Sequence, residues 1–291
     1  MCSYDNTKED TVFKLEVNKM KKVLALVLSL VLVVGVVATL AACGGKEAAP
    51  QSDFEYIQEK GKLTIGITYF APMNYFDENN ELVGFETEFA TAVCAKLGVE
   101  PVFQEISWSA KETELAGKSI DCIWNGMTIT PEREEAMDIS TPYLANKQVL
   151  VVKADKLEDM KILSSGKGLN IVAEKESAGE GVVNSEAFFA ETNYTAVDTQ
   201  AKAFTEVASG IADGCVVDYV CSIGMIGEGT DFEDLVVVDT FNFADEQYGI
   251  AFRKGSDLDE KVNAAITELV NDGTLSKIAA KYKLEEQVIA K

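Results

Sequence analysis

Two nine-residue stretches decide the fold: GKSIDCIWN at residues 117–125 and GIADGCVVD at residues 210–218. Each begins with a glycine, contains an acidic residue and a cysteine, and ends an apolar, strand-like run with a polar residue, Asn125 or Asp218. In open α/β sheets, ligands bind beyond the carboxyl ends of the strands. The pair therefore predicts two lobes that each aim a polar group at a shared cleft. Because helix–glycine–strand units are common, chance similarity is the alternative.

Strand and helix patterns alternate on both sides of these stretches. Phe85, Phe89, Val93 and Leu97 recur every four residues, which predicts a helix that Gly98 ends. Further helices are expected at residues 111–116, from the opening Ser177-Ala178, and near the C-terminus. Apolar runs predict strands at residues 63–67, 102–106, 122–124, 169–173, 215–217 and 249–252.

Two details of the expected helices are specific enough to test. Phe204, Val207, Ala208 and Ile211 should form one buried helical face. The pair Ser256 and Asp259 predicts a capping box at the start of a helix that buries Val262, Ile266 and Leu269.

An uncharged, mostly apolar run begins at Val23, follows Lys21 and Lys22, and ends in Leu-Ala-Ala-Cys at Cys43. This arrangement is typical of a secretory signal. The ending resembles the lipobox of bacterial lipoproteins, in which the cysteine is lipidated and becomes the mature N-terminus. A transmembrane helix is the alternative, since the run is just long enough to span a bilayer. We expect Met20 to be the true start, residues 1–42 to be leader and residues 43–53 to be a lipidated tether.

The composition excludes several functions. A net charge of −22 argues against nucleic acid, whose phosphates require lysine and arginine. The chain has no histidine, the residue most used for acid–base catalysis and for metal binding, so neither an enzyme nor a metal or other cofactor is expected. Four cysteines follow the lipobox, and three pairings are possible. Their apolar surroundings favour buried free thiols instead; they are Cys94, Cys122, Cys215 and Cys221.

The stretch NGMTITPER at residues 125–133 is the densest in chemistry. After a strand end come a glycine, two threonine hydroxyls and Arg133, whose planar guanidinium pairs bidentately with a carboxylate. Asp218 is the complementary group, able to pair with an ammonium. From spacing alone, Arg133 is equally readable as a surface arginine and Asp218 as a turn residue. Together they would bind the two charges of a free amino acid.

The chain resembles the family 3 extracellular solute-binding proteins of polar amino-acid ABC importers. The matching phrases follow the family's order from about Gly61 to Tyr282; they are Gly84-Phe85-Glu86, residues 126–133, Ser140-Thr141-Pro142-Tyr143 and residues 248–254.

This resemblance implies a role for each candidate ligand-binding residue. Arg133 corresponds to the arginine that binds the ligand carboxylate, and Asp218 to the acidic partner of the ammonium. The remaining positions correspond to strand-end groups, to two aromatic walls and to a helix N-terminus that favours an anion; they are Thr128 with Asn125 and Gly126, Phe70 with Trp108, and Ser177 with Ala178.

Some of these assignments have alternatives. Phe70 and Trp108 are also plausible core residues, and Trp124 should face away from Asn125 into the core. Ala178 stands where the family often has threonine, so only its backbone N–H could serve. Met73-Asn74 also departs from the family pattern, which weakens inferences about ligand selectivity.

The resemblance implies a two-lobed α/β fold of the type II periplasmic-binding kind. Lobe 1 should comprise residues 54–147 and 244–291, and lobe 2 residues 148–243. Two crossing strands, near Gln148 and at 243–248, should form a hinge that closes on the ligand.

The expected function is capture of a free amino acid by a monomeric lipoprotein, which delivers it to an ABC permease at the outer face of the cell membrane. Family members that bind cationic or amide side chains tend to carry aspartate where this chain has Ile67. An uncharged side chain of moderate size is therefore expected, either cystine or a neutral polar or thioether amino acid, since an unpaired buried charge is costly. Two alternatives remain: a cyclohexadienyl or prephenate dehydratase-like enzyme that uses a carboxylic acid in the cleft, and a sensory ligand-binding module.

Overall fold

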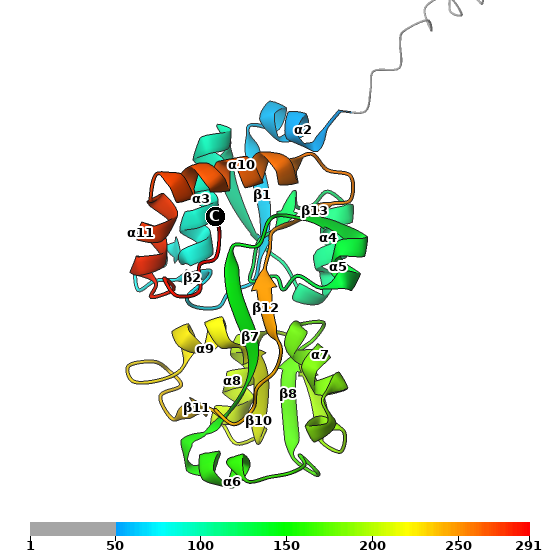
Figure 1. Ribbon diagram of the computed structural model, residues 1–291, viewed down its shortest axis with the longest axis vertical. Coiled ribbons are helices and arrows are strands. Elements are labelled where there is room, and N and C mark those ends of the chain that lie inside the picture. Colours follow the sequence, from blue (N-terminus) through cyan, green and yellow to red (C-terminus); the bar gives the residue numbers. More distant parts are fainter. Residues whose placement is uncertain (1–50) are drawn as a thin grey trace, which may run out of the picture. The chain divides into compact units, whose positions relative to one another are not determined.

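The computed structural model describes residues 51–291, so the predicted leader and Cys43 lie outside the described part. Two α/β lobes follow in which helices pack against separate sheets (Figure 1). The sheet of lobe 1 has the strand order β4-β1-β5-β13-β6. β1 runs parallel to both β4 and β5, whereas β13, from the C-terminal part, is antiparallel. The bounds are β1 Lys62–Ile67, β4 Glu100–Glu105, β5 Cys122–Ile123, β6 Met137–Ile139 and β13 Ala251–Arg253.

The sheet of lobe 2 has the order β11-β7-β10-β8-β9, and β12 pairs with β7. β8 is parallel to β9 and β10, and β10 is antiparallel to β7. A separate ribbon pairs β2 with β3. The bounds are β7 Leu144–Lys153, β8 Asn170–Glu174, β9 Asn193–Val197, β10 Gly214–Asp218, β11 Leu235–Val237, β12 Asp245–Tyr248, β2 Tyr75–Phe76 and β3 Leu82–Val83.

β7 and β12 run side by side where the chain passes between the two sheets (Figure 1). They pair antiparallel from Leu144 opposite Tyr248 to Lys147 opposite Asp245. The rest of β7 continues into the sheet of lobe 2, where Gln148 lies opposite Asp218. These are the two crossing strands that the sequence predicts.

The helices bury the apolar faces expected of them. Phe85, Phe89 and Val93 of α3 are fully buried, and Gly98 ends that helix in the left-handed conformation. Trp124 packs edge-on against Phe89, with ring centres 5.0 Å apart, so its predicted core position is confirmed. The helices are α2 Asp53–Lys60, α3 Phe85–Leu97, α4 Lys111–Ala116, α5 Pro131–Ala136, α6 Leu157–Lys161, α7 Ala178–Ser185, α8 Gln200–Ala208, α9 Tyr219–Met225, α10 Leu258–Asn271 and α11 Thr274–Lys281.

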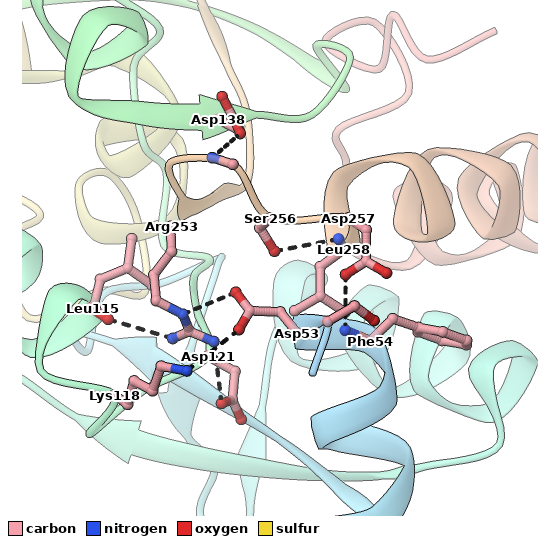
Figure 2. Close-up of polar contacts among 12 residues, drawn as sticks. Asp53, Phe54, Leu115, Lys118, Asp121, Asp138, Arg253, Ser256, Asp257 and Leu258 are labelled. Carbon is pink, nitrogen blue, oxygen red and sulfur yellow. Dashed lines mark hydrogen bonds and ion pairs between the residues drawn. The ribbon is translucent and has the colours of Figure 1, made fainter. Parts of the chain in front are cut away.

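Two helix details differ from the sequence-based prediction. Helix α8 ends at Ala208, and Ile211 is 66% exposed instead of completing the buried face. Helix α10 starts at Leu258 without a side-chain cap, so the predicted capping box is wrong. The Ser256 hydroxyl accepts a bond from the Leu258 N–H, whereas Asp257 accepts one from the Phe54 N–H (Figure 2).

A cluster of charges joins α2 to the sheet of lobe 1 (Figure 2). The Arg253 Nε donates to Asp53 Oδ2 at 2.9 Å, and its Nη1 donates to the carbonyl oxygens of Leu115 and Ile120. Asp121, fully buried, lies 3.8 Å from Arg253 Nη2 and pairs with Lys60 at 2.5 Å. These contacts hold the beginning of α2 against strand β13.

The four cysteines after the lipobox are buried and unpaired, as expected from their apolar surroundings. Burial raises the pKa of the Cys94 thiol to about 12, so it is unreactive near neutral pH. Within residues 51–291, no cluster of side chains suitable for a metal ion is present. None of the helices in this part is both long and apolar enough to cross a bilayer.

Candidate ligand-binding cavity

All nine residues predicted to bind a ligand line one cavity. Strand ends, loops and helix starts of both lobes contribute to it. Phe70, Trp108, Asn125, Gly126, Thr128 and Arg133 come from lobe 1, and Ser177, Ala178 and Asp218 from lobe 2. Three further lining residues were not predicted, namely Thr68, Glu174 and Gln200.

Arg133 is a buried cation in this cavity. Thr130 caps α5 by accepting a bond from the Arg133 N–H, and Pro131 opens the helix, which directs Arg133 inward. Its guanidinium donates to the Thr128 carbonyl at 2.6 Å and the Glu176 carbonyl at 3.2 Å. Within residues 51–291 no carboxylate forms an ion pair with it, and burial lowers its pKa. An anion entering the cavity would meet an uncompensated positive charge.

Asp218 ends strand β10 and is held by three side-chain amides. Asn146 and Gln148 donate to Oδ1 at 2.8 and 2.6 Å, and Gln200 donates to Oδ2. The Gln200 amide oxygen accepts the Asp218 N–H in return. Burial raises the Asp218 pKa, and the amide bonds oppose that rise by favouring the carboxylate. The side chain is thereby oriented for a cationic group in the cavity.

Glu246 of β12 shares the Asn146 and Gln148 amide donors of Asp218, and it was not predicted from the sequence. Gln148 and Asn146 each donate to Glu246 Oε1, as does the Thr128 hydroxyl at 2.9 Å. Burial, and next the charge of Asp218, raise the Glu246 pKa to about 7. With its proton directed to Glu246, the Thr128 oxygen can accept a hydrogen bond from a ligand.

The strand-end groups of lobe 1 are largely bonded within the protein. The Asn125 side chain exchanges two hydrogen bonds with Thr68, at 2.6 and 2.9 Å. The Gly126 N–H donates to the buried Glu86 carboxylate at 2.7 Å, so it is engaged before any ligand arrives. Gly126 has φ of +51°, and a Cβ there would lie 3.0 Å from the Phe70 ring. Glycine is needed at this position for both reasons.

The two predicted aromatic walls are buried and also line the cavity, so each is both a core and a site residue. Phe70 is 4% and Trp108 5% exposed. The indole N–H of Trp108 donates to the Glu176 carbonyl at 3.2 Å. The Arg133 guanidinium lies over its ring, 5.7 Å from the ring centre, as does Lys111 Nζ at 4.9 Å. These cation–π contacts fix Trp108 beside the carboxylate-binding candidate.

Helix α7 directs its N-terminus at the cavity. The Ser177 hydroxyl caps it by accepting the Glu180 N–H at 3.2 Å, and Ala178 is its first residue. Glu176 precedes this cap with φ of +59°, and its carbonyl accepts the bonds from Trp108 and Arg133 described above. A loop of lobe 2 is thus bonded to two lining residues of lobe 1.

Glu174 is the most informative residue that the sequence analysis missed. It is 4% exposed, lines the cavity, and its Oε1 has no hydrogen-bond partner in the structure. Burial, and next the charge of Asp218, raise its pKa to about 8, against the opposing charges of Lys111 and Arg133. The predicted strand stopped at Ala173, one residue short of where β8 ends. With the correct boundary, Glu174 would have been a polar strand end like Asn125 and Asp218.

Ile67 has a different surrounding from the one assumed in the sequence analysis. It is fully buried in the core and does not line the cavity, whereas the next residue, Thr68, does. The residue type at position 67 therefore does not set the polarity of the cavity lining.

Comparison with known proteins is consistent across sequence and structure. Residues 63–285 match the family described as bacterial extracellular solute-binding proteins, family 3. The L-cystine-binding protein TcyJ of Escherichia coli is 28% identical over 253 residues, covering 84% of this chain and 91% of that protein. The ABC transporter glutamine-binding protein GlnH of Bacillus subtilis is 30% identical over 283 residues, covering 92% and 99%. The crystal structure of Tv2483 bound to L-arginine superposes with a TM-score of 0.73 at 27% identity, covering 82% and 97%.

Proposed function

The chain belongs to the bacterial extracellular solute-binding proteins, family 3, and from this membership we propose that it captures a free amino acid between its two lobes. The observation that carries the proposal is the placement of Arg133 and Asp218 on one cavity, from different lobes. A free α-amino acid presents a carboxylate and an ammonium on the same carbon atom. An unpaired guanidinium and an amide-held carboxylate complement these two charges.

The α-amino acid frame is the set of protein groups that we assign to the ligand carboxylate and ammonium. We assign the ligand carboxylate to Arg133 and to the N-terminus of α7 at Ser177 and Ala178, where the helix dipole favours an anion. We assign the ammonium to Asp218 and to the Thr128 hydroxyl oxygen. Two relatives are named for binding cystine and glutamine, and one similar structure is bound to L-arginine. These ligands share the α-amino acid part and differ in the side chain, so they support the class of ligand and leave its side chain open.

Ligand capture would proceed by closure about β7 and β12, with lobe 1 comprising residues 54–147 and 244–291 and lobe 2 residues 148–243. In the structure, the Glu176 loop and Gly224 of α9 contact lobe 1. A Cβ on Gly224 would lie 2.5 Å from the carbonyl carbon of Ala71 and from the nitrogen of Pro72, so only glycine permits this approach. A ligand that bonds both lobes would stabilise the closed form by its differential contacts.

The transport role completes the proposal. We propose that Cys43 carries a lipid anchor after cleavage of residues 1–42, and that the monomeric protein delivers its amino acid to an ABC permease at the outer face of the membrane. The leader run, the Leu-Ala-Ala-Cys ending and the family membership support this location. Two acyl chains suffice for stable anchoring, so no basic surface is needed on a chain of net charge −22.

For the ligand side chain, we propose a polar group of moderate size, with an uncharged one first. Phe70 and Trp108 supply walls for its carbon atoms, and a protonated Glu174 provides hydrogen bonding without a second negative charge. Cystine and neutral polar amino acids are the first ligands to test.

A dehydratase-like enzyme is the second candidate, and one observation favours it. Glu174 is a buried carboxyl that stays protonated at neutral pH, as a general acid requires. Formation of phenylpyruvate, carbon dioxide and water from prephenate would reveal this activity. The unpaired Arg133 and the oriented Asp218 match an amino acid better, and we expect no turnover.

Mass spectrometry of small molecules released from the denatured protein tests the proposed function, together with a thermal-shift panel of the amino acids and cystine. We expect at least one amino acid to be released or to raise the melting temperature. The Arg133→Met variant should lose every such shift. If no amino acid is released and none stabilises the wild-type protein, the proposal is refuted.

A further inference from the structure

Glu174 has a position in the cavity that the α-amino acid frame does not use. Its side chain is nine-tenths buried at the end of β8, and Oε1 has no partner among the described residues. A buried acceptor without a hydrogen bond costs roughly 1–3 kcal/mol, so it is retained where a ligand can satisfy it. The frame assigns the carboxylate and ammonium to Arg133 and Asp218, which leaves Glu174 for the rest of the ligand.

The charged groups that face Glu174 form no ion pair with it within residues 51–291. Lys111 is 3% exposed, but its Nζ lies 3.9 Å from Glu176 Oε2 and over the Trp108 ring. Arg133 is bonded to two carbonyl oxygens, and Asp218 to three amides. Each neighbour thus has its own partners, and no ion pair to Glu174 forms within residues 51–291.

We propose that Glu174 determines ligand selectivity by accepting a hydrogen bond from an N–H group on the ligand side chain. This inference rests on the proposed amino-acid function and narrows its substrate class. The shared chemistry is an N–H donor, carried by a carboxamide, an imidazole, a guanidinium or an ammonium. Thioether and hydrocarbon side chains lack it, and a side chain whose only charged group is a carboxylate would meet the negative potential of Asp218. A site built around a buried acceptor discriminates strongly against ligands that leave it unpaired.

The protonation of Glu174 separates neutral from cationic ligands. Since burial raises its pKa to about 8, the carboxyl is mostly protonated in the ligand-free protein at pH 7. A carboxamide can bond this neutral form through both its N–H and its C=O. A guanidinium or ammonium favours the ionised form instead and releases a proton on binding. Arginine affinity should then rise between pH 6 and pH 8, and glutamine affinity should show no such rise.

Calorimetry with glutamine, arginine, histidine and methionine tests the inference on wild-type protein and on two variants. Glu174→Leu removes the acceptor at similar size, and Glu174→Gln keeps an acceptor without a titratable group. We expect at least one N–H ligand to bind wild-type protein at least tenfold more tightly than methionine. Glu174→Leu should weaken that ligand by at least tenfold and leave methionine unweakened. Glu174→Gln should remove any pH-dependent proton release.

The outcomes separate this inference from the proposed function. Wild-type protein that binds methionine as tightly as every N–H ligand, or Glu174→Leu with an unchanged preference, would overturn the role of Glu174 and leave amino-acid binding intact. Binding of no amino acid at all would instead overturn the proposed function. Thermal unfolding without ligand shows that the variants fold, and Glu174→Leu should be at least as stable because it removes an unpaired buried polar group.

Discussion

Replacing Gly224 by alanine should weaken ligand binding, although residue 224 does not contact the ligand. Gly224 lies on α9 of lobe 2 and does not line the cavity. An added Cβ would lie 2.5 Å from two backbone atoms of lobe 1, at Ala71 and Pro72. Ordinary contacts are about 1 Å longer, so the lobes would have to separate or the backbone to shift. Overpacking of this kind costs about 1–3 kcal/mol, which corresponds to roughly 5- to 150-fold in affinity.

The assay combines calorimetry with the best-binding amino acid and thermal unfolding without ligand. Gly224→Ala should weaken all ligands by the same factor, because the cost falls on closure. The matched control is Gly181→Ala, on α7 of the same lobe, where a Cβ meets no atom within 4 Å. Wild-type affinity in Gly224→Ala would refute the closure argument. The argument would also be refuted if Gly224→Ala lowered the unfolding free energy of the ligand-free protein by as much as it lowered the binding free energy. The contact between the lobes would then exist without ligand.

Four further predictions follow from the cavity and the leader. Arg133→Ala should weaken amino-acid binding at least about a hundredfold in calorimetry, since stranding one charge of a buried pair costs about 3–5 kcal/mol; near-normal affinity would contradict its role. Asp218→Asn should give a comparable loss of amino-acid affinity, and raising the salt concentration should not weaken binding to wild-type protein by as much. Cys43→Ser should move the protein from the membrane fraction to a soluble or uncleaved form in cell fractionation, and unchanged membrane association with normal cleavage would refute lipidation. Ligand-free wild-type protein should lose stability relative to Glu174→Gln as pH rises from about 4.5 to about 8 in chemical denaturation, because the folded state holds the Glu174 proton more tightly than the unfolded state. Each tenfold change in proton affinity is worth about 1.4 kcal/mol, which bounds the effect at about 5 kcal/mol.

Local patterns were sufficient to predict the elements whose burial is set by one helix face or one strand. The four-residue recurrence of Phe85 to Leu97 gives α3 with its end at Gly98, as observed. Ile211 failed because Gly210 has φ of +76° and turns the chain out of α8, so periodicity alone extended the face too far. The box at Ser256 failed because Asp257 bonds Phe54, some two hundred residues away in the sequence.

The residues at the cavity also differ in whether the sequence predicts them. Arg133 and Asp218 were predicted because each lies at a strand end or helix start and because the family resemblance assigned each a role, which spacing alone left open. Glu246 was not, because it reaches the site only through the pairing of β12 with β7, which sets it beside Asn146 and Gln148. Glu174 was lost by an error of one residue in a strand boundary. Sequence patterns thus locate residues positioned by their own element, and they miss those positioned by a distant partner strand.

The attachment of Asp53 to Arg253 has a consequence for how a lipidated protein would sit above the membrane. Nine residues lie between Cys43 and Asp53, and the ten residue-to-residue steps of a fully extended chain reach at most about 35 Å. The charge cluster holds Asp53 against the sheet of lobe 1. The tether therefore cannot lengthen by unwinding α2 without breaking that cluster. Asp53 and the adjoining face of lobe 1 would then remain within that reach of a lipidated Cys43.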